Sequence, residues 1–297
     1  MRFITLCLAL SLSTIAYADT ATGPVASLPK VGDTLALGGN VDWPKLQWLY
    51  EAPSAKDAAG KVVIHWFCQQ KVQACVDDLA RIITLKDTNR VYIVAYVNAA
   101  QQRDAKKLDP IRESEGVGKG TLAFGKGVTT LFKQLGLVSG PASIVVDVDG
   151  KVAMVSTALD ATALDARDTK VTALVGAIKE YTAHHDAPAQ TKAGDKFNLT
   201  LRIQLAPWLK YSDKQPMQAD ISVPKDIKCD TTSLKREQLK IDGQTLTGSI
   251  SCTGPRGVYQ AQGKIKFGYD SPTGSTGFGD VDGIVWKFEL TTTAPAK

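Results

Sequence analysis

One stretch, from Lys61 to Ile83, constrains the fold more than any other part of the chain. Its first part, Val62 to Phe67, is a short apolar run of β-branched and aromatic residues, which is typical of a buried strand. After a polar turn, apolar residues recur with the spacing of one helix face, at Val72, Cys75, Val76, Leu79, Ile82 and Ile83. The sequence therefore predicts a buried strand that leads directly into an amphipathic helix.

Two cysteines lie at this junction. Cys68 closes the strand, and Cys75 falls in the first turn of the helix, where unpaired backbone N–H groups and the helix dipole favour the nucleophilic thiolate. Cys75 is therefore a candidate nucleophile and Cys68 its candidate resolving partner. The alternative is structural, because Cys75 also lies on the apolar stripe, and free cysteine often packs as a small hydrophobe. Seven helical positions would separate the Cα atoms by about 10 Å, so a disulfide requires residues 69–71 to be non-helical.

The N-terminus predicts export. Residues 1–18 contain the charged Arg2, an apolar core from Phe3 to Ile15 and a small-residue cleavage site that ends at Ala18, which together are typical of a secretory signal peptide. The apolar core is too short to span a bilayer. We expect cleavage after about Ala18, a periplasmic or secreted protein, and no transmembrane segment in the mature chain.

The cysteine count supports an oxidising compartment. The chain has five cysteines, and cleavage would remove Cys7, leaving an even number. Even numbers of cysteines in exported proteins favour disulfides. Three pairings are possible, and proximity in the sequence favours Cys68 with Cys75 and Cys229 with Cys252.

Charge and length exclude some classes of function. The formal net charge of +5 is mild, and the lysines are scattered among acidic residues. Because no basic stripe with interleaved aromatic residues is present, we expect no nucleic-acid partner. The mature length is sufficient for two domains that each bury a core.

The first half alternates strands and helices. After a leader at residues 19–30, the sequence predicts further strands at 91–97, 143–148 and 151–156, the last two joined by the turn Asp149-Gly150. Helices are predicted at 128–135 and 168–181. This order predicts an α/β domain at 31–185, with helices that flank a mixed sheet.

The second half has a different period. Residues 186–196 have the composition of a linker, and beyond them the helical period disappears. Strict alternation at 197–205 and four later strand-like runs predict a separate all-β domain at 197–297, a sandwich of immunoglobulin-like type. A structural Cys229–Cys252 disulfide would close a loop of about 24 residues and contribute about 3 kcal/mol.

The order of elements in the first half resembles the thioredoxin superfamily. The resemblance is carried by VVIHWF at 62–67, the cysteine-bearing turn and helix, VYIVAYV at 91–97, and GLVSGPASIVVDVDGKV at 136–152. It implies a cis-proline at Pro141, beside the active cysteine, that shapes a substrate groove. It also implies thiol–disulfide exchange, with protein thiols or disulfides as partners and a membrane thiol reductant as a possible electron donor. No cofactor is expected.

The active-site motif departs from the family. The two positions of the reductase Cys-x-x-Cys fall on Lys71 and Ala74, and a Cys-x6-Cys from Cys68 to Cys75 is present instead. The register of peroxiredoxins places their reactive cysteine on Cys75. However, the proline and threonine that accompany that cysteine are replaced by Cys68 and Val72, which counts against peroxide chemistry.

Histidines offer few further candidates. His65 lies in the first strand, near the place where thioredoxins bury an acid, and is a possible base for a neighbouring thiol. The alternative is a buried structural histidine. His184 and His185 are expected to end a helix, and we predict no metal site there.

Three functions follow as hypotheses. The first is an exported, redoxin-type thiol–disulfide oxidoreductase that acts through a mixed disulfide on Cys75. The second is a non-catalytic thioredoxin-fold binding module, and the third is a thiol peroxidase. Thiol reactivity distinguishes the first from the second.

Overall fold

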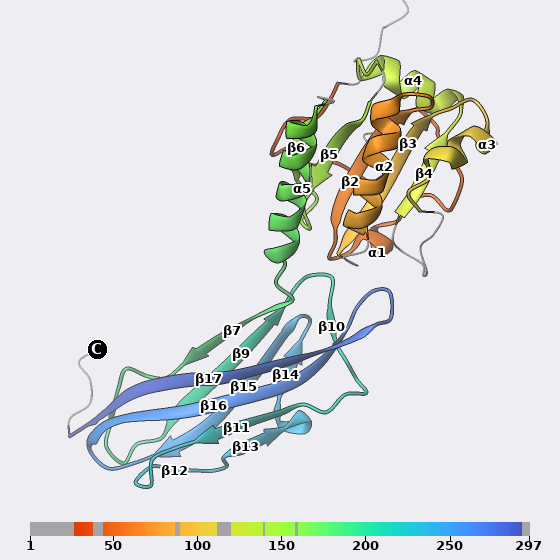
Figure 1. The fold of residues 1–297 in the computed structure, drawn as a ribbon. Coiled ribbons are helices and arrows are strands. Elements are labelled where there is room, and N and C mark those ends of the chain that lie inside the picture. Colours follow the sequence, from red (N-terminus) through yellow and green to blue (C-terminus); the bar gives the residue numbers. More distant parts are fainter. Residues whose placement is uncertain are drawn as a thin grey trace, which may run out of the picture.

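The computed structural model describes residues 27–37, 44–86, 90–111, 120–138, 140–157 and 160–292. The predicted signal peptide at 1–18 lies outside these residues, as does most of the predicted leader. The described chain forms an α/β half followed by an all-β half (Figure 1). Within the described residues, no helix has the length and apolar character needed to cross a membrane.

The α/β half is built on one six-stranded mixed sheet with the order β1-β4-β3-β2-β5-β6. Its strands are β1 (Gln47–Trp48), β2 (Val62–Gln69), β3 (Val91–Asn98), β4 (Gly120–Phe124), β5 (Ala142–Val146) and β6 (Val152–Ser156). Strand β2 pairs parallel with β3, and β3 parallel with β4, whereas β5 runs antiparallel to β2. The two apolar runs at 62–67 and 91–97 are therefore adjacent and parallel in the sheet.

Helices cover both faces of this sheet. They are α1 (Ala55–Ala58), α2 (Gln73–Lys86), α3 (Gln102–Ala105) with the 3₁₀ turn η1 (Lys106–Leu108), α4 (Lys126–Gln134) and α5 (Ala161–Gly176). Helices α2 and α5 pack on one face, through residues such as Ile82 and Val171. Helices α1 and α4 pack on the other, through Ala58 and Leu131. Because both faces are covered, β2 and β3 are buried along almost their whole length.

The α/β half is thioredoxin-like, as its sequence predicts. A central β2-α2-β3 unit continues through β4 and α4 into the antiparallel strands β5 and β6 and the last helix, α5. The peptide bond between Gly140 and Pro141, just before β5, is cis. Each element of the sequence prediction for this half is present, although α5 begins and ends earlier than expected.

The all-β half consists of two sheets that share one core. One sheet has the order β13-β11-β16-β17-β8, with β10 beside β16, and the other has the order β12-β15-β9-β7, with β14 beside β15. The strands are β7 (Tyr181–Asp186), β8 (Gln190–Lys192), β9 (Phe197–Leu205), β10 (Lys210–Tyr211), β11 (Gln218–Ser222), β12 (Lys228–Cys229), β13 (Ser233–Lys235), β14 (Lys240–Asp242), β15 (Thr245–Thr253), β16 (Gly257–Asp270) and β17 (Thr276–Thr291). A 3₁₀ turn, η2 (Arg236–Gln238), follows β13.

The core of this half follows from sequence alternation. In β9, every second residue from Phe197 to Leu205 is buried, and the residues between them are exposed or partly exposed. Trp286 of β17 and Leu246 of β15 belong to the same apolar cluster, so both sheets contribute to it. This is the face-to-face packing of a β-sandwich, as predicted.

The boundary between the halves differs from the sequence prediction. Helix α5 ends at Gly176, and residues 181–186 form β7, which pairs antiparallel with β9. His184 and His185 therefore lie in an exposed strand, not at a helix end. Residues 190–192 form β8, which pairs with β17, so the segment predicted as a linker at 186–196 is hydrogen-bonded into both sheets. Its small residues, proline and glycine occur at strand ends and turns rather than in a flexible connection.

Cys229 and Cys252 form the predicted disulfide. They occupy directly opposite positions on neighbouring strands β12 and β15, and their Cα atoms are 4.0 Å apart. Cys252 is buried and Cys229 is partly exposed. The bond lies within one sheet, whereas the bridge of antibody domains joins the two sheets. The immunoglobulin-like subtype therefore stays a prediction.

Candidate functional site

The candidate site lies where β2 leads into α2. Cys68 is the penultimate residue of β2, and Cys75 is the third residue of α2. Between them the chain makes a tight turn, in which Val72 N–H donates to the carbonyl of Gln69 and Lys71 adopts a φ of 70°. Because the helix begins only at Gln73, residues 69–71 are non-helical, as a disulfide here requires.

Cys68 and Cys75 are joined by a disulfide, with Cα atoms 5.6 Å apart. The pairing favoured by sequence proximity is therefore present in both halves. Both cysteines are fully buried, with 0% exposure, in the apolar cluster between the sheet and helices α2 and α5. The turn at 69–72 joins them, and in it Gln69, Gln70 and Val72 are partly exposed and Lys71 is exposed.

Gly140 and Pro141 pack against the end of β2. Gly140 has a φ of 80°, and a Cβ added there would lie 2.3 Å from the carbonyl oxygen of Phe67 and 3.1 Å from Cα of Cys68. Only glycine fits this approach. The resemblance predicted Pro141 beside the cysteines, and its neighbour Gly140 does contact Cys68. Pro141 itself is buried. A groove of about 350 Å³ next to it is lined by Gly140 and Ala142, together with Leu28, Gly136, Leu137, Val138 and Thr157.

His65 lies on the other face of the sheet. Side chains alternate along β2, so Cys68 faces α2 while His65 faces the cluster under α1 and α4, where its Nδ1 lies 2.9 Å from the hydroxyl of Tyr96. Burial lowers the pKa of His65 to about 3, which keeps the ring neutral. The predicted role of His65 as a base for the cysteines is incompatible with this placement, and the alternative, a buried structural histidine, fits it.

A buried ion pair beside the disulfide is not predicted from the sequence. Asp78, one turn after Cys75, accepts two hydrogen bonds from the guanidinium of Arg167 on α5, at 2.7 and 2.8 Å. Both side chains have 0% exposure. Asp78 also accepts a hydrogen bond of 2.8 Å from the indole of Trp66. Burial lowers the pKa of Arg167, but its bonds to Asp78 and Asp168 outweigh that effect and raise it.

The ion pair had one signal in the sequence. Asp78 lies on the same helical stripe as Cys75 and Ile82, and a buried acid requires a partner. The partner itself, 89 residues further along the chain, could not be identified from local pattern.

The structure describes the two positions at which thioredoxin-like reductases carry the cysteines of Cys-x-x-Cys. Lys71 is exposed in the turn, and Ala74 is partly exposed in the first turn of α2. Val72 occupies the place of the peroxiredoxin threonine, so no hydroxyl stands there to polarise a peroxide. Among the residues that the structure describes, no group of three or more His, Cys, Asp or Glu side chains is arranged to hold a metal ion.

Comparison with known proteins gives similarity only at the level of structure. No family model matches the sequence, and no curated protein matches it. A thioredoxin domain of a thiol-disulfide oxidoreductase from Bacteroides vulgatus is 16% identical, with a TM-score of 0.35, and the match covers 48% of this chain and 99% of that chain.

Two further solved structures are similar in the same way. A thiol-disulfide isomerase from Corynebacterium glutamicum is 20% identical, with a TM-score of 0.33, and the match covers 48% of this chain and 96% of that one. A thiol:disulfide interchange protein from a Bacteroides species is 20% identical, with a TM-score of 0.34, over 52% of this chain and 91% of that one.

Proposed function

We propose that the chain is an exported thioredoxin-fold thiol–disulfide oxidoreductase of redoxin type whose reactive pair is Cys68–Cys75. One observation carries the proposal: the disulfide closes the junction of β2 and α2 and lies against Gly140, next to Pro141. The pair therefore lies at the N-terminus of a helix and close to the cis-proline that, by the resemblance, shapes a substrate groove. The presence of two disulfides supports an oxidising compartment, and hence export.

The reaction is thiol–disulfide exchange. A thiolate of a partner protein attacks the sulfur of Cys75, the Cys68–Cys75 bond breaks, and Cys68 leaves as a thiolate that takes up a proton. A second thiolate of the partner then attacks the mixed disulfide and releases Cys75. The partner dithiol is oxidised to a disulfide, and the pair is reduced to two thiols. The reverse sequence reduces a partner disulfide.

Burial sets a condition on this reaction. Because both cysteines are fully buried, a partner thiolate reaches Cys75 only after the structure around the disulfide opens locally. The turn at 69–72 is the segment that we expect to open, because it is short and its residues are exposed or partly exposed. In the reduced protein, the N-terminus of α2 favours a thiolate on Cys75, and burial disfavours it.

The proposal is tested with the Cys68→Ser variant of the whole chain. This variant keeps Cys75 and removes the resolving thiol, so a partner disulfide should be trapped on Cys75 as a stable mixed disulfide. Oxidised glutathione is the first probe, and mass spectrometry locates the adduct. Cys252→Ser is the matched control, since it frees the partly exposed Cys229 in the other half and reports non-specific reaction.

A second candidate, the non-catalytic binding module, is favoured by one specific observation. Both sulfurs are buried, and Lys71 and Ala74 stand where reductases have cysteines. This candidate predicts that Cys75 of the reduced chain resists iodoacetamide at neutral pH until the fold is denatured. Adduct formation on Cys75 in the folded Cys68→Ser variant would reject it, and complete resistance would reject the oxidoreductase.

A further inference from the structure

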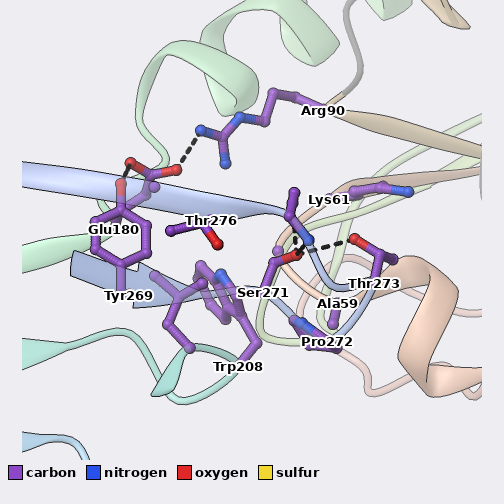
Figure 2. A pocket seen from close by; sticks show the side chains of 14 residues that line it. Ala59, Lys61, Arg90, Glu180, Trp208, Tyr269, Ser271, Pro272, Thr273 and Thr276 are labelled. Carbon is purple, nitrogen blue, oxygen red and sulfur yellow. Dashed lines mark hydrogen bonds and ion pairs between the residues drawn. The ribbon is translucent and has the colours of Figure 1, made fainter. Parts of the chain in front are cut away.

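A cavity of about 280 Å³ lies at the junction of the two halves (Figure 2). Its walls come from the loop before β2, the residue before β3, the segment after α5, the loop between β9 and β10, and the end of β16 with the hairpin that leads to β17. These parts of the chain contribute Gly60, Arg90, Glu180, Trp208, Tyr269 and Thr276. We call this space the junction cavity. Its lining residues Gly60 and Lys61 lie at the N-terminal end of β2, the opposite end of that strand from Cys68.

Side chains of both halves hold the walls together. Glu180 accepts a hydrogen bond of 2.5 Å from Arg90 of the α/β half and another from the hydroxyl of Tyr269 in the all-β half. Trp208 packs on Gly60, where an added Cβ would lie 2.5 Å from the indole Nε1. Gly60 has a φ of 71°, so the approach of the indole and the backbone conformation both require glycine here. Specific contacts between the two halves therefore form the walls of the cavity.

Hydroxyl groups line the side formed by the β16–β17 hairpin. The Ser271 hydroxyl lies 2.9 Å from that of Thr273 and 2.6 Å from that of Ser275. Thr276 follows at the start of β17, where its hydroxyl donates to Asp270 at 2.8 Å and can accept a further hydrogen bond. In Figure 2, Ser271 and Thr276 lie between Tyr269 and the loop that carries Lys61. Hydroxyl groups both donate and accept hydrogen bonds, so this wall suits a ligand whose own groups do both.

The charged side chains of the lining have partners within the protein. The guanidinium of Arg90 is paired with the carboxylate of Glu180, and a strongly charged ligand would compete for either partner. Lys61 is the second cation of the lining, and its ammonium lies over the ring of Tyr92, 5.7 Å from the centroid. The half-buried indole of Trp208 adds a broad apolar face. An aromatic face together with paired planar polar groups and several hydroxyls matches a sugar ring, which has apolar C–H faces and a hydroxylated edge.

We propose that the junction cavity binds a neutral saccharide unit. A sugar ring lies on Trp208, and its hydroxyls exchange hydrogen bonds with Ser275, Thr276 and the Arg90–Glu180 pair. The volume is close to the lower end of small-molecule sites, about 300 Å³, which fits one or two rings. Binding would join groups of both halves, so the ligand would also fix their relative orientation. This inference is independent of the proposed redox function.

The test uses the whole oxidised chain and four probes: glucose, galactose, N-acetylglucosamine and N,N′-diacetylchitobiose. Saturation-transfer NMR detects contact with the ring protons of each sugar at millimolar concentration. At least one probe should bind, and binding should weaken at least tenfold in the Ser275→Ala/Thr276→Val double variant. Ser249→Ala, an exposed serine of β15 outside the cavity, is the matched control and should bind as the unmodified chain does.

Two outcomes would overturn the proposal. The first is the absence of saturation transfer to all four probes. The second is sugar binding that is equally strong in the double variant and in the unmodified chain, which would place the sugar elsewhere. Near-UV circular dichroism checks that the double variant is folded. If it is not, Trp208→Leu replaces it, and unchanged affinity in that variant overturns the proposal in the same way.

Discussion

The two halves differ in what they bury. Among the described residues, the α/β half buries seven polar or charged side chains, namely His65, Asp78, Lys86, Asp109, Thr121, Ser143 and Arg167, whereas the all-β half buries one, Ser212. The core of the all-β half is otherwise apolar and follows strand alternation. Buried polar groups cost stability unless they are paired, so their concentration in one half marks where the chain departs from simple packing.

The two disulfides show the same contrast. Cys229–Cys252 joins directly opposed residues of neighbouring strands, where the chain is already paired. Cys68–Cys75 instead joins the end of a strand to the start of a helix across a turn. The more buried of the two bonds is the one proposed to react. Position relative to the secondary structure, rather than exposure, therefore distinguishes the proposed redox pair from the structural one.

The largest expected effect comes from breaking the buried ion pair. In Arg167→Met, Asp78 would be left as a buried charge without its guanidinium partner, which destabilises a protein by about 3–5 kcal/mol. Chemical denaturation measures the loss. The double variant Asp78→Asn/Arg167→Met should be more stable than the single one, because no uncompensated charge remains. As a control from the other half, Lys266→Met breaks an exposed pair with Asp280 and should change stability by less than about 1 kcal/mol.

Acid should affect the α/β half through His65. The folded state lowers the pKa of His65 to about 3 from an ordinary value of 6.5. Below pH 6.5 the unfolded chain takes up a proton that the folded chain does not. Stability is therefore highest above pH 6.5 and falls with pH by roughly 1.4 kcal/mol per unit, or about 3 kcal/mol at pH 4.

The His65→Gln variant isolates this effect. Its amide keeps a polar partner for Tyr96 and does not titrate, so the variant should lose less stability than the unmodified chain between pH 7 and pH 4. His184→Gln, in the exposed strand β7, should leave the pH dependence unchanged. Equal acid sensitivity of His65→Gln and the unmodified chain would show that His65 is not buried in its neutral form.

Removing either disulfide should cost similar stability but have different effects on exchange. By loop-closure entropy, Cys229→Ala/Cys252→Ala should lose about 3 kcal/mol, and Cys68→Ala/Cys75→Ala somewhat less, because its loop is shorter. Only Cys68→Ala/Cys75→Ala should abolish exchange with oxidised glutathione. Loss of exchange in a folded Cys229→Ala/Cys252→Ala variant would assign the redox centre to the all-β half.

Much of the fold was predictable because hydrophobic period determines it locally. The apolar runs at 62–67 and 91–97, the helical stripe through Cys75 and the alternation at 197–205 each bury their apolar residues as predicted. The strand β7 was missed because its sequence, YTAHHD, is exposed at nearly every position and has no period. Only its pairing with β9, a non-local contact, makes it a strand.

The candidate site was also predictable in part, because its two cysteines lie close together in the sequence. The Cys68–Cys75 pairing follows from their proximity and from the turn between them. The sequence did not show that both sulfurs are buried, that His65 faces away from them, or that Arg167 reaches Asp78. These properties depend on which face of β2 each side chain occupies and on the packing of α5, which lies far along the chain.

The smallest expected effect concerns the junction of the halves. Glu180 follows α5 and bonds both Arg90 and Tyr269. Burial raises the pKa of Glu180, but its hydrogen bonds from Tyr269 and Arg90 outweigh this and lower it below the ordinary 4.5. The carboxylate therefore links the halves at neutral pH, and the link is lost as the pH falls through that lowered pKa. Tyr181, near Tyr269, also faces this contact.

Glu180→Gln should mimic the acid state at neutral pH. The pair is partly exposed, so we expect a loss of at most about 1 kcal/mol, equivalent to an about fivefold increase in opening of the junction. The exposed Lys179 provides a tryptic site there, and the rate of cleavage after it, followed by mass spectrometry, measures the opening. Glu289→Gln, which alters an exposed contact within the all-β half, is the control. If Lys179 were cleaved equally fast in Glu180→Gln and in the control, the halves would be held together by the packing of Trp208 on Gly60 and not by the Glu180 link.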